Sequence, residues 1–112
     1  MKTKLIEKYN AVVVELKGNV MGGDDTKEFN QLLHKLIEEG KKNIIVDLSG
    51  VKFMNSSGLG MMISGLTTMK REGGNLKLAN VTEKIESLLI ITKLITIFET
   101  FESIDEAVKS FE

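Results

Sequence analysis

The sequence contains no cysteine and no proline, and neither sign of charge is in marked excess. Without cysteine there can be no disulfide, thiolate metal site or cysteine nucleophile, which fits a reducing compartment such as the cytoplasm. Lys and Arg number 15 against 16 Asp and Glu. Because no basic surplus is available to neutralise phosphates, we expect no direct binding of nucleic acid.

Long apolar runs are also missing. The apolar run Leu88 to Ile91 is far shorter than the ~20 residues that span a bilayer, and the N-terminus lacks the apolar stretch of a signal peptide. We therefore expect a cytoplasmic protein with no membrane insertion. With 112 residues, 42% of them hydrophobic and 28% charged, the chain has the composition of one globular domain over residues 1–112.

The hydrophobic pattern alternates between strand and helix periods. Strands that alternate with helices favour an α/β fold, here a mixed, mostly parallel sheet of four or five strands with about four helices. An antiparallel hairpin through Tyr9 and Asn10 would form its first edge. The predicted order is ββαβαβαβα, with strands at 4–8, 12–16, 44–48, 76–79 and 95–98, and helices at 24–40, 56–71, from 82 and from 103.

Polar residues mark three of the predicted helix starts. Asp24 and Asp25 follow two glycines, and their carboxylates suit the free amides of a first turn. Thr82 is a reasonable N-cap, and Ser103 with Glu106 has the spacing of a capping box. The acidic pair lacks the glycine-spaced ligands of a calcium loop, so we interpret it as a helix start rather than a metal site.

The segment from Asn55 to Gly60 lies between a predicted strand and a predicted helix. In parallel sheets, ligands and partners favour the crevice beyond the carboxyl ends of the strands, which is where this segment should lie. Asn55 or Ser56 can cap the helix. Gly58 and Gly60 would let its first turn approach neighbouring backbone closely.

The helix that follows has two different predicted faces. One apolar stripe would face the sheet, and the opposite face is small and uncharged where a solvated helix usually carries Lys and Glu. Met61 is assigned to this outer face as an adaptable contact residue, and the face is interpreted as a protein-docking surface. The sheet-facing set is Leu59, Met62, Ile63, Leu66 and Met69, and the outer set is Ser57, Gly60, Met61, Ser64, Gly65 and Thr68.

Ser57 lies at the N-terminal edge of that outer face. A phosphate there would add about −1.5 to −2 charge, and the helix dipole and free amides would tolerate the anion. A partner packed over a neutral face would instead meet a desolvated dianion. Phosphorylation of Ser57 is therefore expected to break binding without unfolding the domain.

The motif Asn55-Ser56-Ser57-Gly58-Leu59-Gly60, with its flanking strands, resembles the anti-sigma-factor-antagonist family of STAS domains. The resemblance covers nearly the whole chain. It extends to three further segments and the tail, which are residues 18–25, 45–49, 74–78 and 91–98. The resemblance implies a binding protein rather than an enzyme, without a cofactor.

In that family an anti-sigma factor, which is also an ATP-dependent serine kinase, phosphorylates the second serine of the motif. The unphosphorylated protein binds this kinase and frees the sigma factor, and a phosphatase resets the cycle. By position, the acceptor here is Ser57. The partner-binding residues expected from the motif and the helix face are Asn55, Ser56, Ser57, Gly58, Gly60, Met61 and Ser64, in a monomer or weak dimer.

Two alternatives stay open. The family usually has Asp where this chain has Asn55, which favours an unphosphorylated STAS scaffold or a transporter-associated subunit. A nucleotide-binding domain is a weaker alternative, because no Lys-Ser or Lys-Thr pair follows the glycines as a phosphate loop requires. His34 has no catalytic or metal-binding companion at a recognisable spacing and is assigned to the surface.

Overall fold

The computed structural model describes every residue from Met1 to Glu112. Its elements follow the predicted order ββαβαβαβα, which confirms the α/β class. None of the four helices is long and apolar enough to cross a membrane. The elements are β1 (Lys2–Glu7), β2 (Val12–Val20), α1 (Asp24–Glu38), β3 (Asn43–Met54), α2 (Ser56–Arg71), β4 (Asn75–Ala79), α3 (Glu83–Ile91), β5 (Thr100–Phe101) and α4 (Ile104–Lys109).

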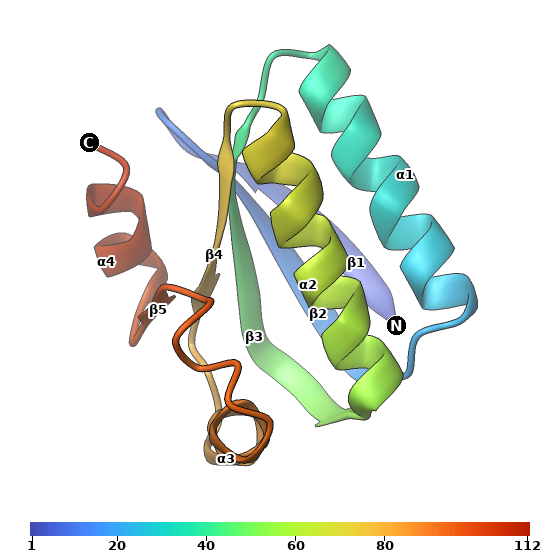
Figure 1. Cartoon of the computed structure of the whole chain (residues 1–112). Coiled ribbons are helices and arrows are strands. Elements are labelled where there is room, and N and C mark those ends of the chain that lie inside the picture. Colours follow the sequence, from blue (N-terminus) through green and yellow to red (C-terminus); the bar gives the residue numbers. More distant parts are fainter.

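The five strands form one sheet in the order β1-β2-β3-β4-β5. The hairpin pair β1 and β2 is antiparallel, with Ile6 opposite Val13, and every other neighbouring pair is parallel. Because the connections through α1 and α2 return the chain in the same direction, β2 and β3 both end at the same edge of the sheet. The start of α2 and the start of α1 therefore lie at that edge (Figure 1).

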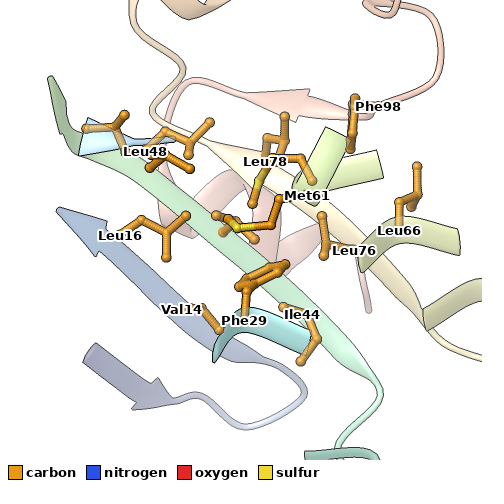
Figure 2. Close-up of a cluster of buried hydrophobic side chains, with 14 of the residues drawn as sticks. Val14, Leu16, Phe29, Ile44, Leu48, Met61, Leu66, Leu76, Leu78 and Phe98 are labelled. Carbon is orange, nitrogen blue, oxygen red and sulfur yellow. The ribbon is translucent and has the colours of Figure 1, made fainter. Parts of the chain in front are cut away.

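The helices cover the two sheet faces unequally. Figure 1 shows α1 and α2 side by side on one face, with α4 on the other. The first face carries a cluster of 22 buried apolar residues, and the second carries a cluster of five. Figure 2 shows part of the larger cluster, with Phe29 of α1 among side chains from the strands. The main core is thus the layer between the sheet and the helix pair.

The fifth strand lies later than its predicted position at 95–98. Residues after α3 form a turn instead, in which the amides of Leu94 and Ile95 donate to the carbonyl of Leu89. Phe98 is buried in the main core, so its apolar character serves packing rather than strand pairing. The sheet bonds come from residues just beyond, where the amide of Leu78 donates to the carbonyl of Glu99. The predicted boundaries of the fifth strand were therefore wrong, since the strand starts five residues later and ends three residues later than expected.

The predicted helix caps are confirmed for two helices. The Thr82 hydroxyl accepts from the amide of Ile85 at 3.4 Å, and the Ser103 hydroxyl accepts from the amide of Glu106 at 3.1 Å. At α1 the N-cap is Gly23, which makes no side-chain cap bond. Asp25 lies within the first turn of α1, and its carboxylate accepts from the amide of Met21, which precedes the helix, at 3.3 Å.

Candidate functional site

The candidate site begins where β3 ends and α2 begins. Asn55 is the N-cap of α2: its Oδ1 accepts from the amide of Gly58 at 2.8 Å. Its own amide donates to the carbonyl of Val20 at the end of β2, at 3.3 Å. Of the two predicted cap candidates, Asn55 is therefore confirmed, and Ser56 is excluded because it is the first helical residue. Asn55 takes that role because its extended backbone lets the side chain reach the free amides.

Gly58 packs α2 against the end of β2. A Cβ on Gly58 would lie 2.2 Å from the carbonyl oxygen of Val20, far inside van der Waals contact. Gly58 is buried, so the expectation that it contacts a partner is corrected. The close approach that only glycine permits is its structural role.

Ser57 is exposed on the first turn of α2. It lies against the loop between β2 and α1, where a Cβ on Gly22 would be 2.5 Å from the Ser57 Cβ. The first turn of α2 contains no acidic residue. A phosphate on Ser57 would thus meet a helix N-terminus that no carboxylate of its own first turn neutralises.

Met61 is buried, with only 2% of its surface exposed, and its predicted place on the outer face was wrong. Figure 2 shows it inside the main core together with Phe29. The reason is that α2 packs against α1 as well as against the sheet, so its buried arc is wider than one stripe. Gly65 and Thr68 are buried as well, and a Cβ on Gly65 would lie 2.7 Å from the Phe29 ring.

The exposed residues of α2 instead form a narrower stripe. We call it the outer face of α2 and define it as Ser56, Ser57, Gly60, Ser64 and Thr67. All five are small and uncharged, and a Cβ added to Gly60 would meet open space. Thr67 was missed in the sequence, although its spacing from Ser56, Gly60 and Ser64 follows one helix face. Charged residues return only at the end of the helix, with Lys70 and Arg71.

The outer face is not hollowed. Ser57 lines neither of the two cavities found in the structure. One cavity, of about 230 Å³, lies between the end of β3 and α3, and the other, of about 290 Å³, lies at the opposite edge of the sheet. A flat, uncharged face suits the surface of another protein better than a small ligand, which would need a concave site. His34 is exposed on α1, as expected.

A family model described as the STAS domain matches residues 2–107. The chain belongs to the STAS domain family. An anti-sigma-B factor antagonist from Bacillus subtilis is 32% identical over 83 residues, which are 71% of this chain and 75% of the relative. A Staphylococcus epidermidis anti-sigma-B factor antagonist is 33% identical over 67 residues, or 62% of its own length.

Solved structures support the STAS fold. A Thermotoga maritima protein, provisionally named an anti-sigma factor antagonist, has a TM-score of 0.87 at 22% identity, with 97% of this chain and 93% of that one covered. The Bacillus cell fate determinant SpoIIAA in its phosphorylated form has a TM-score of 0.75 at 18% identity, with 99% and 100% covered. At these identities the two likenesses concern the STAS fold alone.

Proposed function

We propose that this STAS domain is an anti-sigma factor antagonist that binds an anti-sigma factor kinase and is switched off by phosphorylation of Ser57. The observation that carries the proposal is the exposed Ser57 at the start of α2, next to a helix face without charge. The curated relatives in the same family are named anti-sigma factor antagonists, which supports the choice of partner.

Binding would use the outer face of α2. Its small side chains lose little conformational entropy when a partner covers them, and no charge has to be desolvated. Asn55 keeps the first turn ordered through its bond to Gly58, so the face is formed before the partner arrives. A preorganised surface of this kind reduces the cost of association.

Phosphorylation would act through electrostatics. The γ-phosphoryl group of ATP is transferred to the Ser57 Oγ, ADP leaves, and the hydroxyl proton is lost to the kinase or to solvent. The product carries about −1.5 to −2 charge at pH 7. Covering that charge with a neutral partner surface removes its hydration, so the complex dissociates while the domain stays folded. A phosphatase would restore the hydroxyl by hydrolysis and release inorganic phosphate.

The test uses the anti-sigma factor kinases encoded in the same genome, each purified and incubated with this protein and ATP. Mass spectrometry should place one phosphate on Ser57, and Ser57→Ala should abolish it. Ser57→Asp should weaken kinase binding at least tenfold by calorimetry, about 1.4 kcal/mol, with an unchanged circular dichroism melt.

Ser56 provides the matched control, because it is also exposed and lies one residue earlier on the same turn. Ser56→Ala should still accept one phosphate on Ser57, whatever its effect on the rate. Phosphate on Ser56 instead, or equal labelling of the Ser57→Ala protein, would contradict the assignment. Kinase binding that is equally tight for Ser57→Asp and wild type would favour an unphosphorylated scaffold.

A further inference from the structure

The loop between β2 and α1 touches the candidate phosphorylation site through one glycine. Gly22 is buried, has φ of +80°, and lies where an added Cβ would be 2.5 Å from the Ser57 Cβ. The same added atom would be 3.1 Å from the Ser57 carbonyl carbon and 3.2 Å from its oxygen. The backbone of Gly22 therefore lies so close to Ser57 that no side chain fits at position 22.

The adjacent Gly23 offers a contrast. It also has a positive φ, +59°, but a Cβ on Gly23 would have no heavy atom within 4 Å. Any L residue at either position would strain the backbone. Only at position 22 would the residue also collide with Ser57.

The loop cannot easily move away to relieve such a collision. The Gly22 carbonyl accepts from the Asp25 amide at 3.1 Å, which ties it to the first turn of α1. The Asp25 carboxylate holds the Met21 amide on the other side of Gly22 and lies 3.6 Å from the N-terminal amine of Met1. The first turn of α2, which carries Ser57, is also held in place, because Gly58 packs directly against the end of β2.

We infer that Gly22 is a positioning residue for Ser57: its missing side chain sets where the Ser57 hydroxyl sits on the first turn of α2. The inference rests on the proposed function, because it assigns a role in presenting Ser57 to a kinase. A side chain at position 22 would have to displace Ser57 by about 1 Å to restore ordinary van der Waals contact. Displacements of that size at a reacting group cost up to about 100-fold in rate.

The experiment compares Gly22→Ala with Gly23→Ala in the full chain. Both variants lose stability from backbone strain, so initial rates of phosphorylation are measured at a temperature where circular dichroism finds each fully folded. Gly22→Ala should slow transfer to Ser57 by about tenfold to 100-fold, and Gly23→Ala should stay within twofold of wild type. Equal slowing in the two variants, or wild-type rates in both, would overturn the inference.

A second measurement does not depend on the kinase. In amide-correlation NMR spectra, Gly22→Ala should shift the amides of Ser57 and Gly58, and Gly23→Ala should shift mainly residues at the start of α1. If wild type accepts no phosphate, the proposed phosphorylation fails, and the amide shifts alone decide whether Gly22 positions Ser57. Unshifted Ser57 and Gly58 amides in Gly22→Ala would overturn the positioning role even if the kinase labels wild type.

Discussion

The two faces of α2 have opposite compositions although they share one backbone. The inner face contains Leu, Met and close-packed glycines that meet the sheet and α1, and the outer face contains only serine, threonine and glycine. The inner residues are mostly buried in the main core, so substitutions there should change the free energy of unfolding. On the outer side the residues are exposed and only Ser57 lies against another segment, at Gly22, so substitutions at the other positions should change binding and alter stability by no more than about 1 kcal/mol.

The largest expected effect is at Met61, the residue whose placement differs most between sequence and structure. Met61→Ala should lower the free energy of unfolding by about 2–5 kcal/mol, because it leaves a cavity in the main core. Urea unfolding followed by circular dichroism measures it. Ser64→Ala on the outer face is the control and should change stability by less than about 0.5 kcal/mol. A Met61→Ala protein as stable as that control would place Met61 on the surface after all.

Gly58 should rank next. Gly58→Ala forces a methyl group against the carbonyl of Val20, and overpacking of this kind costs about 1–3 kcal/mol, occasionally more. The same urea titration should detect the loss. An unchanged midpoint would mean that the start of α2 can move away from β2, and the proposed rigidity of the Ser57 turn would then be wrong.

Removal of the cap should have a smaller effect. Asn55→Ala deletes the acceptor for the Gly58 amide and should cost about 0.5–2 kcal/mol. Asn55→Asp keeps an acceptor and adds a negative charge at the helix N-terminus, so its stability should equal or slightly exceed that of wild type. Ser56→Ala should leave stability unchanged, and urea unfolding followed by circular dichroism measures all three variants. A loss at Ser56→Ala equal to that at Asn55→Ala would return the cap to Ser56.

The smallest expected effect is an increase, rather than a decrease, in the free energy of unfolding. Gly60→Ala adds a methyl group in open space and should stabilise the helix by about 0.5–1 kcal/mol. Kinase binding should nevertheless weaken if the outer face of α2 is the docking surface, and calorimetry on the same protein measures this. Stronger or unchanged binding by Gly60→Ala would argue that the partner docks elsewhere.

The extent of prediction from sequence differs between the fold and the site. Element order, the antiparallel edge and the strand-to-helix position of Ser57 follow from hydrophobic period and turn residues, which act over a few neighbouring positions. The fifth strand was misplaced because the apolar residues at 95–98 suit a strand and a buried turn equally well. Outside the site, the caps at Thr82 and Ser103 were predictable from residue type and position. Within the site, the choice between Asn55 and Ser56 as the cap of α2 was not.

The sequence by itself determined the α/β class and brought Ser57 to the carboxyl edge of the sheet, since helix and strand periods are local properties of the chain. Only the tertiary structure decided which side of α2 is exposed, because that depends on where α1 packs. It also brought Gly22 against Ser57, although the two are 35 positions apart along the chain. Periodicity describes one helix against one layer; contacts between elements arise only when all the layers are assembled.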